Sequence, residues 1–402
     1  MKYSACFLAA FAVATAPATA AERLPISENT TVIETALGQL LYTQTVVQEG
    51  AEPINRFTMH RLRRANLPAR GTLLLLPPLG NNFNGYLTSL DGDISRSFAG
   101  NFARLGYDVL GYSPRETGIA AGACASGLDC TPALNWSLQT VVDDVAYIRS
   151  QIETTSPGVL PVIGGLSLGA ISALATVNQY PSQYAGLLAW EGSLATNDAA
   201  IQAHNQTFCT QFEGAVAGGI VFDDQSLPLV KAVAQLAQTA PNDPFVIPVP
   251  GFPPGLTNRQ AFLLILTTPN PVAPSPRPGF ISAAGSVPIG QLFFSDEARL
   301  AANIADFNDV TANRTTRDLY CSLAGTETAY SSNLAQFAGP VFVVKAGQGF
   351  GSIMDELPSR LGSTAVTVVE NGAFGHVDHL GSPNHLFLLE APLAKWLGGI
   401  FP

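Results

Sequence analysis

The stretch VIGGLSLGAIS, residues 162–172, decides how the rest of this sequence is interpreted. It contains a G-x-S-x-G pattern centred on Ser167, which also arises by chance in unrelated sequences. The residues before the serine are apolar enough for a buried strand, and LGAISALATVNQY after it has the composition of a helix. A serine on such a strand-to-helix turn needs small neighbours, because strand and helix approach closely there. Gly165, Gly169 and Ala170 meet this requirement, so we interpret Ser167 as a candidate nucleophile.

Strands and helices alternate on both sides of this turn. Continuous apolar runs, typical of buried parallel strands, occupy residues 71–80, 107–114, 184–192, 339–347 and 363–372. Helical periodicity is found at 93–105, 137–152 and 385–399. Residues 31–64 instead alternate apolar and polar positions, as antiparallel strands do. This order predicts an α/β protein with a mostly parallel central sheet flanked by helices.

The helix expected at 137–152 has a clear apolar face, which carries Leu138, Val141, Val142, Val145, Ile148 and Ile152. Asp143, Asp144 and Arg149 fall off that face. Such a division into an apolar and a charged face is typical of an amphipathic helix.

The alternation stops after Gly192 and resumes at residue 339. Between these points the chain is rich in proline, as in PNPVAPSPRPGF, and contains only short helical pieces. A chain of 402 residues is long for one hydrophobic core but can hold a core with a large insertion. We therefore predict a core made of residues 21–192 and 339–402, interrupted by an inserted cap or lid at 193–338.

The N-terminus has the pattern of a cleavable signal peptide. Lys2 is followed by the short apolar run CFLAAFAVATA and by an A-x-A cleavage site that ends at Ala20. This run is shorter than the roughly 20 residues needed to span a bilayer, and AFLLILTT at 261–268 is shorter still. We expect residues 1–20 to be removed and the mature chain to be secreted or periplasmic, without a stable membrane anchor.

The composition excludes one class of partner and fits another. The chain has only four lysines and a net charge of -10, which argues against nucleic acid, whose phosphates require dense positive charge. Apolar residues make up 47% and charged residues 12%, so a sizeable core and a charge-poor surface are expected. Such a chain is better suited to neutral or apolar small molecules, including lipid-like or polyester-like substrates.

Four cysteines remain after the predicted signal peptide. An even number in an exported chain indicates disulfides. Cys124 and Cys130 lie in CASGLDC, a loop short enough to close on itself, which leaves Cys209 to pair with Cys321. The C-x5-C spacing and the scarcity of histidine nearby disfavour a zinc site, so we expect no metal.

With these elements in place, the sequence resembles the α/β-hydrolase superfamily over roughly residues 30–192 and 339–400. In that family the catalytic residues follow the chain order nucleophile, acid, histidine. The resemblance places the histidine at His376, after the strand TAVTVVENG, and its G-H-x-D context looks like the histidine turn of acid lipases. The other histidines are competitors or packing residues: His379, His385, His60 and His204.

The resemblance leaves the acid open. The family's usual position, just after the strand PVFVVKAG, reads GQGFGS here and offers no acid before Asp355. Pancreatic-type lipases place the acid one strand earlier, which corresponds to Glu191. We favour Glu191, keep Asp355 as the alternative, and rank Asp378 third because it is too close in sequence to His376 to orient its ring easily.

The resemblance also implies an oxyanion hole. One N–H should come from the residue after the nucleophile, Leu168, and the second from the loop after the third strand. That loop reads PPLGNN, with prolines where the family usually has His-Gly. Because proline has no N–H, Leu79 or Gly80 must be the donor, and we choose Leu79.

These residues imply a secreted serine hydrolase that cleaves carboxylic esters of apolar substrates and needs no cofactor. The same residues could also cleave β-diketone carbon–carbon bonds, lactones or amides, because a fold does not determine its substrate. A third hypothesis is a binding protein on an inactive hydrolase scaffold. Haloalkane dehalogenases and epoxide hydrolases are disfavoured, since those relatives carry aspartate in place of Ser167.

Overall fold

The computed structural model describes residues 22–89, 91–269, 273–283 and 291–402. The predicted signal peptide at 1–20 lies outside these residues. Within the described chain, no helix is both long and apolar enough to cross a membrane.

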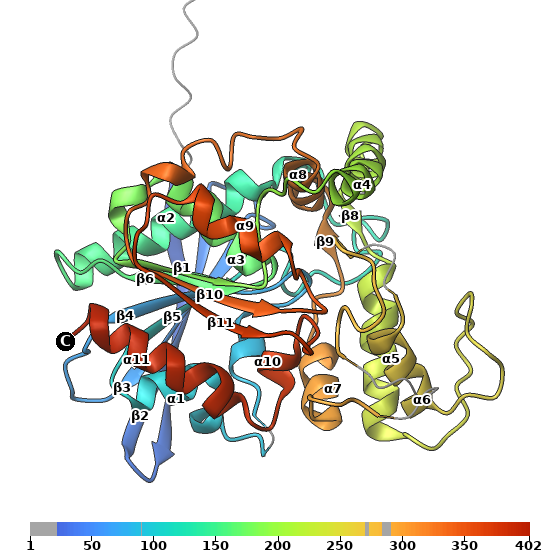
Figure 1. Cartoon of the computed structure of the whole chain (residues 1–402), viewed down its shortest axis with the longest axis horizontal. Helices are drawn as coiled ribbons and strands as arrows, with labels where there is room; N and C mark the ends of the chain where they lie inside the picture. The colour runs from blue at the N-terminus through green and yellow to red at the C-terminus, as the bar shows by residue number, and fades with distance from the viewer. Residues whose placement is uncertain (1–21, 90, 270–272, 284–290) are drawn as a thin grey trace, which may run out of the picture.

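A nine-stranded sheet forms the centre of the described chain (Figure 1). Its strands are β1 Arg23–Thr35, β2 Gly38–Glu49, β3 Arg56–Arg64, β4 Thr72–Leu76, β5 Asp108–Ser113, β6 Val162–Leu166, β7 Gly186–Trp190, β10 Val341–Ala346 and β11 Val366–Asn371. Their order across the sheet is β1-β2-β3-β5-β4-β6-β7-β10-β11. The first three strands pair antiparallel, β3 pairs antiparallel with β5, and all later pairs are parallel. The predicted mostly parallel sheet with an antiparallel N-terminal part is confirmed.

Both faces of β4 to β7 and of β10 are buried, which explains their continuous apolar runs, whereas β11 at the edge of the sheet is partly exposed. In β4, Leu74 and Leu76 join one core cluster, whereas Leu73 and Leu75 join the other. The first cluster contains side chains of α2 (Leu138–Thr155), α3 (Leu168–Gln179) and α9 (Ile353–Arg360). The second contains those of α1 (Phe98–Arg104) and α11 (Ala391–Ile400). Helices therefore cover the sheet on both sides, as Figure 1 shows.

Short helical turns connect these elements. They are η1 Phe83–Tyr86, η2 Ile94–Arg96, η3 Thr131–Asn135, η4 Pro181–Gln183, η5 Leu334–Gln336, the four-residue α10 Asp378–Gly381 and the π-helical turn η6 Leu386–Glu390. The helix predicted at 385–399 is thus a π-helical turn that continues into α11.

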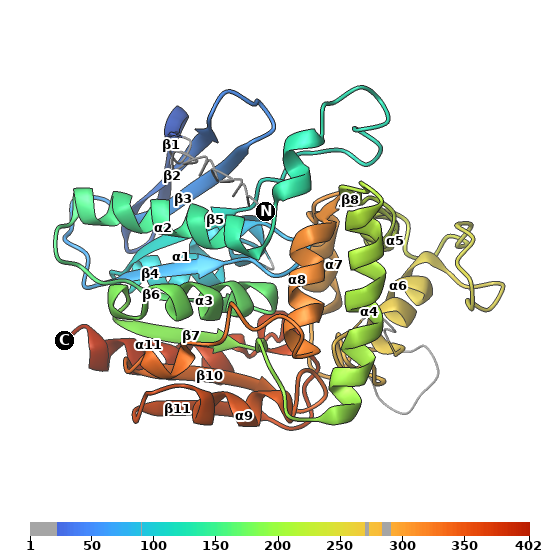
Figure 2. The ribbon, with the colours of Figure 1, turned by 90° about the horizontal axis from the view of Figure 1, so that it is seen from above.

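The 193–338 segment lies between β7 and β10, which are themselves hydrogen-bonded neighbours. Its elements are α4 Ala199–Ala217, β8 Phe222–Asp223, α5 Ser226–Thr239, α6 Asn258–Thr267, α7 Glu297–Ala305, β9 Thr311–Ala312, α8 Asn313–Leu323 and the turn η5 given above. Figures 1 and 2 show its helices gathered beyond the end of the sheet to which the β10 and β11 arrowheads point. The segment therefore stands over the edge at which the strands' carboxyl ends meet.

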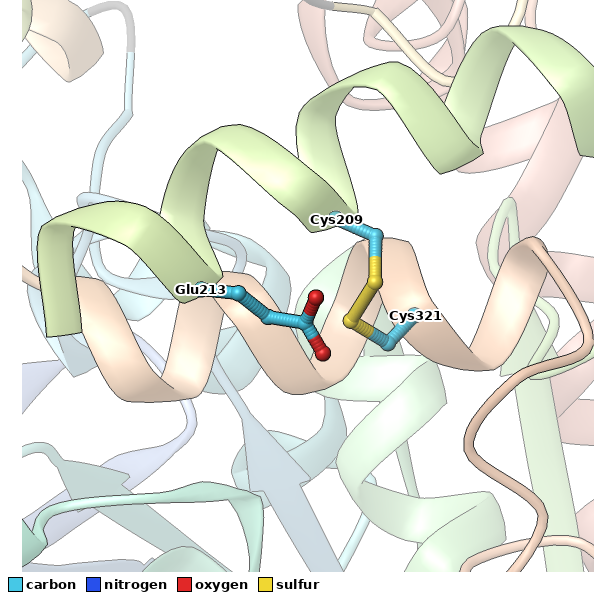
Figure 3. Close-up of side chains that lie close together, drawn as sticks. All are labelled: Cys209, Glu213 and Cys321. Atoms are coloured by element: carbon cyan, nitrogen blue, oxygen red, sulfur yellow. A yellow bond between two sulfur atoms is a disulfide. The ribbon is translucent and has the colours of Figure 1, made fainter. Parts of the chain in front are cut away.

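The described residues contain two disulfides, with the predicted pairing of Cys124 with Cys130 and of Cys209 with Cys321. The second joins α4 to α8 within the 193–338 segment, and Figure 3 shows these two helices side by side.

Two of the charged residues that lie off the apolar face of α2, Asp144 and Arg149, are nevertheless buried. Asp144 is fully buried, and its carboxylate accepts hydrogen bonds from Arg115 at 2.6 and 2.9 Å. Arg149 is also buried, and its guanidinium donates to the carbonyl of Gln183 and to Glu153. Partners from distant parts of the chain compensate the burial of these charges, which helical periodicity cannot reveal.

Candidate active site

Ser167 occupies the predicted turn between β6 and α3. Its backbone has φ 60° and ψ -121°, a combination that is strained for a residue with a side chain. A Cβ atom at Gly165 or Gly169 would collide with the carbonyl oxygen of Leu76. The glycines are thus required by close packing against β4, as the sequence pattern predicted.

Glu191 follows β7 and is fully buried. It too has a positive φ, 51°, and with Ser167 it makes up two of the three non-glycine residues of the described chain in this conformation. Such strain persists only where the surrounding structure enforces it, and it concentrates at functional sites. The Ser167 N–H donates to the carbonyl of Trp190 at 2.9 Å, so the two strained turns lie side by side.

The Glu191 carboxylate lies within a set of three donors. Its Oε1 accepts from the N–H of Ala346 at 2.6 Å, and its Oε2 accepts from the N–H of Phe350 at 2.8 Å. The same Oε2 lies 3.2 Å from Nδ1 of His376. The backbone bonds hold the carboxylate in one orientation, with one oxygen directed at the imidazole.

His376 is buried against two aromatic rings, which also contact each other at a centroid distance of 6.1 Å. The ring centroids of Phe280 and Phe350 lie 5.1 and 5.4 Å from that of the imidazole, and both rings stack on it. The backbone N–H of His376 also donates to the carbonyl of Phe280 at 2.6 Å. Since Phe280 belongs to the 193–338 segment, that segment helps to hold the histidine.

No protein-family model matches this chain, and no curated protein sequence matches it. Solved structures are similar to it over most of their length. A candidate lipase from Sulfolobus solfataricus is 16% identical with a TM-score of 0.62, and the match covers 92% of this chain and 99% of that one. The chain has the α/β-hydrolase fold.

Two further structures match with lower scores. A thermophilic esterase from Thermogutta terrifontis is 11% identical with a TM-score of 0.45 over 93% of this chain and 100% of that one. A monoacylglycerol lipase from Paleococcus ferrophilus is 13% identical with a TM-score of 0.45 over 86% and 99% of the two chains.

Asp355, the alternative acid, does not lie beside His376. It belongs to the first turn of α9, where its Oδ1 pairs with Nζ of Lys345 at 2.6 Å, and its side chain is 59% exposed. The loop GQGFGS, which in many relatives of this fold supplies the acid, instead makes room for Glu191. A Cβ at Gly349 would collide with Oε2 of Glu191.

Asp378, ranked third, makes a different set of contacts. This fully buried carboxylate accepts from the N–H groups of Gly375 and Ala283 at 2.6 and 2.9 Å. It also accepts from the hydroxyls of Ser282 and Ser295 at 2.6 and 2.5 Å. Three of these four donors belong to the 193–338 segment, so Asp378 joins that segment to the loop that carries His376.

The competing histidines have their own surroundings. His385 Nδ1 lies 2.6 Å from Oε1 of Glu390, and half-buried His204 contacts the carbonyl of Ala273. His60 is buried between the hydroxyls of Tyr42 and Ser113, at 2.8 Å from each. Burial lowers the pKa of His60 to about 3. The prediction that these residues serve packing agrees with their contacts.

His379 is fully buried, and neither of its ring nitrogens has a hydrogen-bond partner among the described residues. Burial lowers its pKa to about 4. Below pH 6.5 the unfolded chain therefore binds a proton that the folded protein cannot bind, and stability falls as the pH drops from 6.5 towards 4. Since one pKa unit corresponds to about 1.4 kcal/mol, this loss amounts to about 3 kcal/mol at most.

We expect His379→Leu to weaken this dependence, because leucine binds no proton in the unfolded chain. Thermal unfolding of the wild type and the variant at pH 4.5 and pH 7.5 measures it. The drop in melting temperature between the two pH values should be smaller in the variant. An equal drop would show that other groups cause the acid sensitivity.

The predicted oxyanion loop follows β4. Leu168 is the first residue of α3, so its N–H has no acceptor within the helix. The N–H of Leu79 has no acceptor among the described residues either. Gly80 has φ 74°, and a Cβ there would meet the side chain of Leu227 in α5. Among the described residues, neither of the two predicted donors, the N–H groups of Leu168 and Leu79, has a hydrogen-bond acceptor.

Buried asparagines join this loop to the 193–338 segment. Asn81 Nδ2 donates to Oδ1 of Asn303 at 3.0 Å, and Asn308 Nδ2 donates to the carbonyl of Asn81 at 3.2 Å. The N–H of Asn308 donates to the carbonyl of Gly80 at 2.8 Å. The segment thus contacts both the histidine loop and the oxyanion loop.

Among the described residues, one group could in principle supply three metal ligands, namely Cys209, Glu213 and Cys321. Figure 3 shows its two sulfur atoms bonded to each other. A thiolate, and not a disulfide sulfur, is the metal ligand that cysteine provides, so only one carboxylate remains.

Phe280, Gly349 and Asn303 were not among the residues predicted from the sequence. Gly349 carried a signal, because three glycines stand where an acid usually lies in this fold. No sequence signal indicated a role for Phe280 or Asn303, because both lie in the 193–338 segment, far in sequence from the loops that they contact.

Proposed function

We propose that this protein is an exported serine hydrolase that cleaves carboxylic esters of apolar substrates. The observation that carries the proposal is the contact between Glu191 and His376 beside the strained turn of Ser167. A buried carboxylate hydrogen-bonded to a histidine, next to a serine on a nucleophile turn, is the arrangement that acyl transfer requires. The fold shared with the candidate lipase is consistent with this function.

In the proposed reaction, Oγ of Ser167 attacks the ester carbonyl and its proton moves to Nε2 of His376. The oxyanion that forms accepts hydrogen bonds from the N–H groups of Leu168 and Leu79. The intermediate then expels the alcohol, which takes the proton from His376. A water molecule then attacks the carbonyl of the acyl-serine while His376 takes its proton. The second intermediate releases the acid, and His376 returns the proton to Oγ of Ser167. Glu191 keeps the Nδ1 proton on the imidazole and stabilises the imidazolium.

The 193–338 segment would form the cap over this site. It stands over the carboxyl ends of the strands, where ligands bind in open α/β sheets (Figure 2). Its contacts with the histidine and oxyanion loops indicate that the cap also holds catalytic groups. We expect neither a metal nor an organic cofactor in this reaction.

A fluorophosphonate probe and a substrate series test the proposed function. The probe should label the wild-type enzyme at Ser167, and p-nitrophenyl esters should be hydrolysed. A β-diketone, a lactone and an amide assayed in parallel separate the ester reaction from the other reactions of this fold. Faster cleavage of the β-diketone than of any ester would overturn the choice of substrate. Absence of labelling would favour a non-catalytic binding protein.

Asp378→Asn is expected to lower kcat for an ester by roughly 10- to 100-fold with little change in KM. Asparagine is uncharged and has one oxygen in place of two, so it cannot accept all four hydrogen bonds made to the carboxylate, and the loop that carries His376 should shift. A displacement of about 1 Å in a catalytic group can cost a factor of about 100 in rate. Steady-state kinetics with a short-chain ester measures the effect.

Asp318→Asn is the matched control. Like Asp378, Asp318 is a buried aspartate that connects the 193–338 segment to the rest of the chain. Asp318 lies in the segment itself and accepts a hydrogen bond from the N–H of Leu138 at 3.1 Å. Among the described residues, it makes no hydrogen bond to the loop that carries His376. Both variants should melt at lower temperature, and only the Asp378 variant should lose kcat. An equal loss of kcat in both would mean that Asp378 matters for stability alone.

A further inference from the structure

A small cavity lies beside the predicted oxyanion hole. Its volume is about 20 Å³, enough for one water molecule or a group of that size. Its lining comes from the oxyanion loop, the end of β5 and helices α2, α3 and α8: Leu76, Pro77, Pro78, Gly80, Tyr112, Pro114, Glu116, Val141, Leu168, Ser172 and Thr315. The cavity therefore shares Leu168 with the site at which the substrate carbonyl would bind, and it includes Gly80, the neighbour of the second proposed donor, Leu79.

Glu116 is the charged residue in this lining, and it is only 8% exposed. The hydrogen bond to its carboxylate comes from its own backbone, and no side chain among the described residues donates to it. A buried carboxylate with no hydrogen bond from a side chain is costly, which makes Glu116 a candidate for a ligand contact.

The neighbouring polar groups are already engaged. Arg115 pairs with Asp144 and with Glu49, at 2.6 Å in each case. The hydroxyl of Tyr112 donates to Asp144 at 3.2 Å. Among the described residues, neither neighbour hydrogen-bonds to Glu116, although the positive charge of Arg115 acts to lower the pKa of the Glu116 carboxyl.

The remaining polar groups of the lining are the hydroxyls of Ser172 and Thr315, and the rest is largely apolar. Burial raises the pKa of the Glu116 carboxyl to about 7, so near neutral pH it can donate as well as accept a hydrogen bond. A hydroxyl group fits these surroundings, since it has the size of the cavity and can play either role. An ammonium group would have to lose its hydration in a mostly apolar space.

The cavity lies on the acyl side of the expected site. Its lining includes Leu168 but no residue of the loop that carries His376. Because His376 would protonate the leaving alcohol, the alcohol must lie on the histidine side, and the acyl chain on the other. We propose that this cavity is a subsite for a hydroxyl group on the acyl chain, a few bonds from the carbonyl, and that Glu116 is its hydrogen-bond partner. This inference rests on the proposed ester hydrolysis and adds a substrate class, esters of short hydroxy acids.

Two isosteric esters test the subsite. Methyl 3-hydroxybutanoate and methyl 3-methylbutanoate differ by a hydroxyl in place of a methyl group. A hydrogen bond to a buried carboxylate should give the wild-type enzyme a preference of about tenfold or more in kcat/KM for the hydroxy ester. Glu116→Leu should bring this ratio close to one. Glu116→Gln, which keeps an acceptor of the same size, should retain part of the preference.

Glu390→Gln is the matched control, because Glu390 is a buried acid that pairs with His385 and does not line the cavity. In this variant, the ratio of kcat/KM for methyl 3-hydroxybutanoate to that for methyl 3-methylbutanoate should equal that of the wild type. If Glu116→Leu does not fold, as judged by circular dichroism, the wild type and Glu116→Gln decide the question. A wild-type ratio near one would overturn the subsite and leave a cavity that holds only water. Failure to hydrolyse either ester, or methyl butanoate, would overturn the proposed function itself.

Discussion

Ser167→Ala is expected to lower kcat for ester hydrolysis by about 10⁶-fold. Removal of the nucleophile of a serine hydrolase leaves only the catalysis that the oxyanion hole and substrate binding provide. Because alanine fits where serine does, KM and the melting temperature should change little. Burst kinetics with a p-nitrophenyl ester, together with fluorophosphonate labelling, measures the effect, and both the burst and the label should disappear.

Ser193→Ala is the control for this variant. Ser193 is a buried serine that follows Glu191 by two residues, and among the described residues its hydroxyl hydrogen-bonds only with the backbone of Ala195. Its loss should leave kcat within about threefold of the wild type. Substantial turnover by Ser167→Ala would mean that another residue is the nucleophile.

Glu191→Gln is expected to lower kcat by about 10⁴-fold, the loss that follows when the acid of a triad is replaced by its amide. The amide would leave the imidazole in the wrong tautomer, because its nitrogen donates where the carboxylate accepts. Glu191 also accepts from the N–H groups of Ala346 and Phe350, so the variant should melt at lower temperature as well. Activity is therefore compared well below the melting temperature of the variant.

Asp355→Asn is the decisive comparison. Its side chain is largely exposed and pairs with Lys345, so the substitution should leave kcat within about threefold of the wild type. If Asp355→Asn loses activity and Glu191→Gln keeps it, the assignment of the acid is wrong. The pH dependence of kcat/KM supplies a second readout, since loss of Glu191 should change the limb that reports the imidazole.

Local sequence was sufficient for the elements around Ser167. The apolar run before it, the glycines beside it and the helical periodicity after it are properties of neighbouring residues, and they predicted the turn that the structure contains. The disulfides could be predicted for a similar reason, since one loop is short and only two cysteines remained.

From the sequence, the candidates for the acid that pairs with His376 could be reduced to a few, but the choice among them could not be made. Glu191 and Asp355 both follow strands of the same sheet, and each could reach its carboxyl edge. The choice depends on the glycines of the loop after β10, which leave space for Oε2 of Glu191, and on Lys345, which pairs with Asp355. These are contacts between side chains more than 150 residues apart or on different elements.

Sequence by itself determined the fold class, the nucleophile turn and the pairing of the cysteines, because spacing and local composition govern strands, helices and turns. Only the tertiary structure decided that Asp144 is buried, that Glu191 faces His376, that Asp378 and the asparagines join the 193–338 segment to the core, and that Glu116 faces a cavity. Each of these depends on which distant groups meet a buried charge. Since a charge leaves water only where such groups compensate it, no local pattern can reveal its position.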